Sequence, residues 1–79
     1  MIIQLKVFGS LRYYPPNPTL MAGNRLELLE GTTVGQVMEV LNFPRRLNLL
    51  FLINKVPADR DSVLTDGDLL HILPQMSGG

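Results

Sequence analysis

One apolar helical stripe dominates this 79-residue sequence and limits the folds that are open to it. In the segment "TTVGQVMEVLNFP", apolar side chains recur at the i, i+3, i+4 and i+7 spacing that forms one face of a helix: Val34, Val37, Met38 and Leu41. Thr33 is a suitable N-cap, and Gln36 completes the spacing of a capping box. We expect Pro44 to end the helix. A chain this short builds a single core, so we interpret the stripe as part of that core rather than as a partner-binding surface.

Strand-like alternation precedes the helix. Residues 2–8 alternate between a predicted core face and an opposite face, which consist of Ile3, Leu5 and Val7 and of Gln4, Lys6 and Phe8, respectively. Residues 25–30 alternate again, with Leu26 and Leu28 on one side. We expect this second strand to be an antiparallel neighbour of the first. The connecting segment, Tyr13 to Asn24, is rich in proline and turn formers and is interpreted as a loop.

Two further strands are predicted after the helix. Residues 49–54 are apolar on both parities, which is typical of a strand with little solvent on either side and leaves its faces unassigned. Residues 69–73 alternate, with Leu70 and Ile72 toward the core and Leu69, His71 and Leu73 turned away. Residues 55–68 between them are interpreted as turn and loop, and Asp66-Gly67-Asp68 is the strongest turn signal. The order of elements therefore predicts an α+β domain with one helix packed on a mixed sheet.

Composition excludes several classes of function. Seven acidic and seven basic side chains cancel and are scattered, so no nucleic acid or anionic membrane is expected as a partner. The chain has no cysteine and one histidine, His71, which leaves no thiolate or histidine-rich metal site and no Cys/His catalytic pair. We expect a cytoplasmic protein, because there is no disulfide framework and residues 1–8 are too short and too polar for a signal peptide or a membrane span. Asp66 and Asp68 are interpreted as turn residues rather than metal ligands, and no metal is expected.

The end of the sequence, "LTDGDLLHILPQMSGG", provides the most specific signal. Together with "VFGSLR" after the first strand and Asn54 at the end of "LFLIN", it resembles the ubiquitin-like β-grasp sulfur carriers, the MoaD/ThiS family. The resemblance spans nearly the whole chain, and "VFGSLR" favours the branch of the molybdopterin synthase small subunit. It implies a β-grasp domain over residues 1–74, with four to five strands, and a flexible Gly-Gly tail over residues 75–79.

The resemblance also implies the chemistry. A ubiquitin-activating-like adenylyltransferase would adenylate the Gly79 carboxylate with ATP, and sulfur from a donor protein would then displace AMP to leave a thiocarboxylate. The chain itself would be a carrier or a non-catalytic synthase subunit, with no stably bound cofactor and with the large subunit of molybdopterin synthase as a partner. Gly78 and Gly79 suit this task because a backbone without Cβ atoms can pass through a narrow active-site channel. Pro74 would end the last strand and start the tail.

Such a tail needs a recognition surface on the folded body. The helical crossover favours strands from its two sides in one sheet, so we expect residues 2–8 and 69–73 to be adjacent and parallel. Phe8, His71 and Leu73 then share one non-core face and form a candidate partner-binding patch, to which Pro74 and Met76 add the start of the tail. His71 is interpreted as a surface contact rather than a general base.

Three functions remain open at this stage. The chain is a sulfur carrier for molybdopterin, tungstopterin or thiamine synthesis, a ubiquitin-like modifier joined through Gly79 to lysines of other proteins, or a non-catalytic β-grasp interaction module. The two lysines of the chain, Lys6 and Lys55, are candidate isopeptide acceptors in a modifier system, although we expect both to be ordinary solvated side chains.

Overall fold

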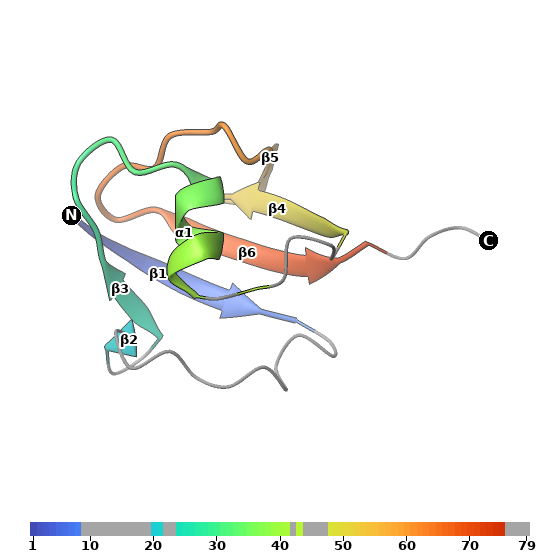
Figure 1. The fold of residues 1–79 in the computed structure, drawn as a ribbon, viewed down its shortest axis with the longest axis horizontal. Coiled ribbons are helices and arrows are strands. Elements are labelled where there is room, and N and C mark those ends of the chain that lie inside the picture. The colour runs from blue at the N-terminus through green and yellow to red at the C-terminus, as the bar shows by residue number, and fades with distance from the viewer. Residues whose placement is uncertain (9–19, 22–23, 42, 44–47, 76–79) are drawn as a thin grey trace.

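The computed structural model describes residues 1–8, 20–21, 24–41, 43 and 48–75. Six strands and one helix follow one another along these residues: β1 (Ile2–Val7), β2 (Leu20–Met21), β3 (Arg25–Glu27), α1 (Val34–Val40), β4 (Leu49–Ile53), β5 (Val56–Ala58) and β6 (Leu69–Pro74). The strands form one sheet in the order β2-β3-β1-β6-β4-β5. Figure 1 shows α1 lying across one face of this sheet, which confirms the predicted two-layer α+β arrangement.

The first and last strands are neighbours at the centre of the sheet. β1 and β6 run parallel, with Lys6 opposite His71 and Val7 opposite Ile72. β3 pairs antiparallel with β1, and β4 pairs antiparallel with β6. After β1 the chain continues through β2 and β3, crosses one face of the sheet as α1, and forms β4 and β5 before it enters β6 (Figure 1). This long connection allows β6 to run parallel to β1. Both predicted neighbours of β1 are therefore confirmed.

The core lies between α1 and the sheet. The helical stripe, the inward residues of four strands and one residue of the segment between β5 and β6 are buried together: Ile3, Leu5, Leu26, Val34, Val37, Met38, Leu41, Phe51, Leu64, Leu70 and Ile72. The stripe and the inward faces of β1 and β6 are thus as the alternation predicts. Thr33 caps α1, since its hydroxyl accepts a hydrogen bond from the Gln36 N–H and the Gln36 side chain accepts one from the Thr33 N–H. The helix ends at Val40 with Leu41 as C-cap, while Pro44, expected to end it, lies outside the described residues.

Two short strands occupy segments that the sequence indicated as loop, and this part of the prediction was wrong. β2 lies inside the segment Tyr13 to Asn24 and pairs antiparallel with β3, and β5 lies inside residues 55–68 and pairs antiparallel with β4. Asn54 and Lys55 both have positive φ, at 52° and 69°, as the central residues of a tight type I′ hairpin turn require. With these two additions the sheet has six strands, beyond the four to five that we expected.

The turn Asp66-Gly67-Asp68 holds the start of β1 and the start of β6 together. Gly67 adopts a φ of 86°, and the Asp66 carboxylate accepts a hydrogen bond from the Ile2 N–H at 2.7 Å. The buried Asp68 carboxylate accepts hydrogen bonds from the Asn54 side-chain amide at 2.9 Å and from the Thr65 N–H at 2.8 Å. Both carboxylates are therefore occupied by turn contacts, in agreement with the interpretation of these residues as turn formers.

Candidate functional site

β6 is the element that leads toward the predicted tail. It lies between β1 and β4, its last residue Pro74 is opposite Leu49, and the Gln75 N–H donates to the Asn48 carbonyl oxygen at 2.9 Å. The strand ends at Pro74, as expected, and the hydrogen bond of Gln75 continues the contact with the residue before β4 by one position. Met76, Gly78 and Gly79 lie outside the described residues, so the tail over residues 75–79 and the roles of these three residues stay predictions.

The structure brings Phe8 and His71 into direct contact on the face of the sheet opposite α1. Their rings meet edge to face, with centroids 5.3 Å apart and an interplanar angle of 85°. Phe8 reaches this position because its N–H donates to the Ile72 carbonyl oxygen at 3.0 Å, which extends the contact between the two strands by one residue. Both side chains are half-buried. Leu73 projects from the same face two residues after His71 and is also half-buried.

Two residues of this face were missed by sequence reasoning. Leu50 lies opposite Leu73 and Leu52 lies opposite His71 in the antiparallel pair of β4 and β6, so both share the face of their partners. Leu50 is 48% exposed, a large fraction for a leucine in a strand next to the centre of the sheet. The run of residues 49–54 is apolar on both parities, and only the pairing register separates its outward leucines from the buried Phe51.

Lys6 completes the surface. Its Nζ lies 5.2 Å from the centroid of the Phe8 ring, within the range of a cation–π contact. Lys6 is exposed, as expected, but it packs over an aromatic ring instead of standing free in solvent. We call this surface the outer sheet face, and it consists of Lys6, Phe8, Leu50, Leu52, His71 and Leu73.

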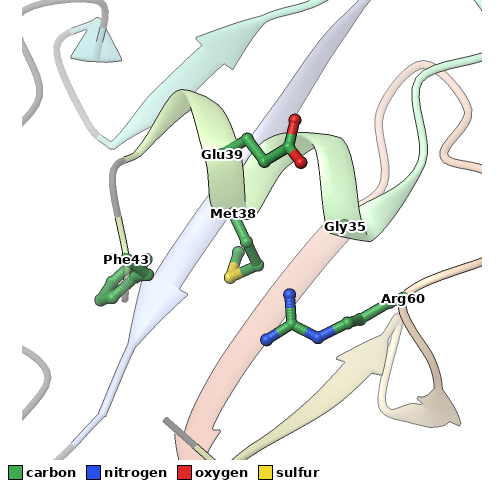
Figure 2. Close-up of a pocket in the computed structure, with 5 residues that line it drawn as sticks. All are labelled: Gly35, Met38, Glu39, Phe43 and Arg60. Atoms are coloured by element: carbon green, nitrogen blue, oxygen red, sulfur yellow. The ribbon is translucent and has the colours of Figure 1, made fainter. Parts of the chain in front are cut away.

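The opposite layer carries a small cleft between α1 and the segment that follows β5. Figure 2 shows the Arg60 side chain extending beneath α1 toward Met38, with Gly35 and Phe43 at the two ends of the cleft. Its volume is about 260 Å³, below the roughly 300–1,000 Å³ typical of ligand pockets. The Gly35 N–H donates to the Arg60 carbonyl oxygen at 2.9 Å, and a Cβ at Gly35 would come within 3.1 Å of that oxygen. The cleft is therefore a place where loop and helix pack closely.

The described side chains offer little for catalysis. Among the described residues there is no group of three or more His, Asp or Glu that could hold a metal ion, and no helix long and apolar enough to cross a membrane. His71 contacts an aromatic ring and lies opposite Lys6 and Leu52, which is the arrangement of a surface contact. What the outer sheet face can do is bind the apolar surface of another protein.

The comparisons with known proteins agree with this arrangement. The crystal structure of SAMP1 from Haloferax volcanii is similar, with a TM-score of 0.69 and 19% identity over 100% of both chains. The crystal structure of H. volcanii small archaeal modifier protein 1 is similar too, with a TM-score of 0.71 and 21% identity over 95% of this chain and 98% of that chain. Both similarities confirm the predicted β-grasp, ubiquitin-like fold. A search of curated proteins found no match. The sequence model of the ThiS family matches residues 5–79, nearly the whole chain, and the protein therefore belongs to the ThiS family.

Proposed function

We propose that the protein is a sulfur carrier whose Gly79 carboxylate is adenylated and then converted to a thiocarboxylate, which donates sulfur in the synthesis of molybdopterin or tungstopterin. The observation that carries the proposal is the family match, because it runs through Gly78 and Gly79. ThiS-type β-grasp proteins are generally carriers rather than catalysts. The position of β6 supports the proposal, since a central strand supplies a rigid base from which the tail can be presented.

The reaction requires activation of the main chain itself. An oxygen of the Gly79 carboxylate attacks the α-phosphorus of ATP, and pyrophosphate leaves. Sulfur at the oxidation level of hydrosulfide then attacks the acyl carbon of the adenylate, and AMP leaves with the electron pair of the broken C–O bond. The product is a thiocarboxylate, and the activating enzyme supplies the catalytic groups. This division of roles fits a chain without cysteine, in which no side chain can carry the sulfur as a persulfide.

The outer sheet face is the proposed docking surface for the activating enzyme and for the large synthase subunit. Phe8, His71 and Leu73 provide its anchors, and Leu50 and Leu52 enlarge it toward β4. Apolar and aromatic side chains at the centre of an interface contribute most of its binding energy. Pro74 and Met76 would then lie at the entrance of the channel that receives the tail.

The choice of pathway rests on the segment "VFGSLR", which is similar to the molybdopterin branch and favours a pterin product over thiamine. A second candidate function is conjugation to lysines of other proteins through Gly79. It is favoured by the two crystal structures with the same fold, because both are of a protein that is named a small archaeal modifier protein. Adenylation of Gly79 is common to both functions, and the fate of the adenylate separates them.

The test uses the purified protein, the adenylyltransferase encoded in the same genome, ATP, Mg²⁺ and sodium sulfide. We expect ATP–pyrophosphate exchange that depends on the protein, and an intact-mass change equal to one oxygen replaced by sulfur at Gly79. A chain that lacks Gly79 is the matched control and should show neither signal. The thiocarboxylate form, mixed with the large synthase subunit and its pterin precursor, should then yield the dithiolene product.

Other outcomes would reject the proposal. Exchange without sulfur incorporation, accompanied in the native host by isopeptide-linked species, would assign the protein to the modifier class. Absence of exchange with every adenylyltransferase of the host would leave the β-grasp interaction module as the function.

A further inference from the structure

Lys6 is a charged residue among apolar and aromatic neighbours on the outer sheet face. The adjacent strands β1, β6 and β4, together with the residue after β1, present Ile2, Gln4, Lys6, Phe8, Leu50, Leu52, Leu69, His71 and Leu73 on the face opposite α1. Among these residues Lys6 is the one side chain with a permanent charge. It lies opposite His71 in the parallel register, so the charge is next to the anchors rather than at the rim of the sheet.

The contact with Phe8 fixes where this charge lies. The Lys6 Nζ is 5.2 Å from the centroid of the Phe8 ring, and the His71 ring meets the same Phe8 ring at 5.3 Å in an edge-to-face arrangement. Lys6 and His71 thus flank Phe8 and restrict the orientation of its ring. A side chain held in this way loses less conformational freedom when a partner binds, and its charged group meets the partner at a defined place.

Binding of an apolar partner surface has a consequence for Lys6. A partner that covers Phe8 and His71 also removes water from the Lys6 ammonium group beside Phe8. Removing water from an ammonium group that has no counter-ion costs much free energy, and the cation–π contact compensates only part of the lost hydration. A complementary partner must therefore place an acceptor of negative charge opposite Lys6.

We propose that Lys6 determines partner specificity on the outer sheet face, and that the activating enzyme receives Phe8 in an apolar pocket bordered by a carboxylate that pairs with Lys6. This inference rests on the proposed function and adds the chemistry of the partner surface to it. An apolar surface without the carboxylate would be rejected, since docking it would bury the ammonium group unpaired. Lys6 thereby separates the proper partner from other exposed apolar surfaces of the cell.

The test compares a substitution that removes the charge of Lys6 with one that keeps it. Lys6→Met removes the charge and keeps an unbranched side chain that can still cover Phe8, whereas Lys6→Arg keeps a cation at the same place. Lys55→Met is the control, because it makes the same change of net charge at an exposed residue of the β4–β5 turn, away from the outer sheet face. Binding to the adenylyltransferase is measured by surface plasmon resonance at low and high salt, and thermal unfolding is measured for every variant.

We expect Lys6→Met to weaken binding by about tenfold or more and to flatten the salt dependence of the association rate, because the pair that salt screens is lost. Lys6→Arg should bind within about threefold of the parent protein and keep its salt dependence. Lys55→Met should match the parent protein in both readouts.

Two results would overturn the inference while leaving the proposed function intact: a folded Lys6→Met variant that binds like the parent at both salt concentrations, or an equal loss in Lys55→Met, which would indicate a general effect of net charge. A parent protein that is neither bound nor adenylated refutes the proposed function itself, and the inference with it. If Lys6→Met lowers the unfolding temperature and Lys6→Arg fails to restore binding, Lys6 has a structural role and the inference is wrong.

Discussion

Replacing Asp68 with asparagine is expected to destabilise the domain by about 2 kcal/mol, because the substitution makes an acceptor into a donor that faces another donor. Asp68 is 8% exposed, and its two carboxylate oxygens accept hydrogen bonds from the Asn54 side-chain amide and from the Thr65 N–H. The Asn54 carbonyl oxygen in turn accepts from the Leu69 N–H at 2.9 Å. These hydrogen bonds therefore connect the β4–β5 turn to the start of β6.

The expected loss in the free energy of unfolding follows from which group donates and which group accepts in each of these hydrogen bonds. An asparagine at this position can keep its carbonyl oxygen toward Thr65, but its amide group then meets the amide group of Asn54. Asn54 cannot turn its side chain to accept, because its oxygen would leave the Leu69 N–H. One hydrogen bond to a charged acceptor is lost, which costs about 1.5–3 kcal/mol. A loss of about 2 kcal/mol lowers the unfolding temperature of a domain of this size by roughly 8–16 °C.

The effect depends on pH in a defined direction. Burial raises the pKa of Asp68, but hydrogen bonds from Thr65 and Asn54 together lower it by more, so that the pKa lies below its ordinary value of 3.8. A carboxyl group with a depressed pKa in the folded state stabilises the fold fully above its unfolded pKa, and this contribution is lost as pH falls through the folded pKa. The difference between the parent protein and Asp68→Asn should therefore be constant above about pH 5 and narrow below 3.8.

Urea denaturation followed by circular dichroism at a series of pH values measures both quantities. Asp66→Asn is the matched control, since Asp66 is exposed and asparagine retains an oxygen for its one bond to the Ile2 N–H. Its cost should remain below about 0.5 kcal/mol. Equal stability of Asp68→Asn and the parent protein at pH 7, or a gap that widens in acid, would refute the assigned network.

Three further outcomes are expected. Leu41→Ala should cost about 2–5 kcal/mol in chemical denaturation, because Leu41 is buried at the end of the helical stripe, and a neutral effect would contradict its place in the core. Phe8→Glu and Leu73→Glu should weaken binding to the adenylyltransferase by about tenfold or more while the unfolding temperature changes little, whereas unfolding of either variant would show that its side chain supports the core. Deleting Gly79 should abolish ATP–pyrophosphate exchange and shift stability by less than about 0.5 kcal/mol, and Gly78→Ala should be a milder version of the same defect; full exchange by the shortened chain would exclude the carrier mechanism.

The helix and strands that were predictable from the sequence are those in which the buried side chains recur at the regular spacing of a helix or a strand. Val34, Val37 and Met38 are buried on a helix, and Leu70 and Ile72 are buried on a strand, because in a small domain with one core nearly every regular apolar position must face that core. The adjacency of β1 and β6 required more than periodicity. It followed from the helical crossover, which favours strands from its two sides in one sheet.

The elements that were missed are short or apolar on both faces. β2 has two residues and β5 has three, so neither is long enough to show alternation, and their pairing with β3 and β4 decides their conformation. Proline is disfavoured inside a sheet, but Pro57 is compatible with β5, because β5 lies at the edge of the sheet, where a missing N–H removes no ladder bond. Leu50 and Leu52 were left unassigned for the complementary reason, since only their register with β6 identifies them as part of the outer sheet face.

The central place of β6 links the outer sheet face to the tail and limits where a partner can perform its chemistry. Leu70 and Ile72 anchor β6 in the core, while His71 and Leu73 on the same strand face outward, so a partner that binds the outer sheet face also fixes the position of Gln75. Four residues separate Gln75 from the carboxylate of Gly79, and a fully extended chain spans at most about 3.3–3.6 Å per residue. The α-phosphorus of ATP in the activating enzyme must therefore lie within roughly 13–14 Å of Gln75 when the outer sheet face is docked. Each residue removed from the tail shortens this reach by more than the tolerance of an in-line attack, so that a change in tail length affects the chemistry while the docking contacts remain intact.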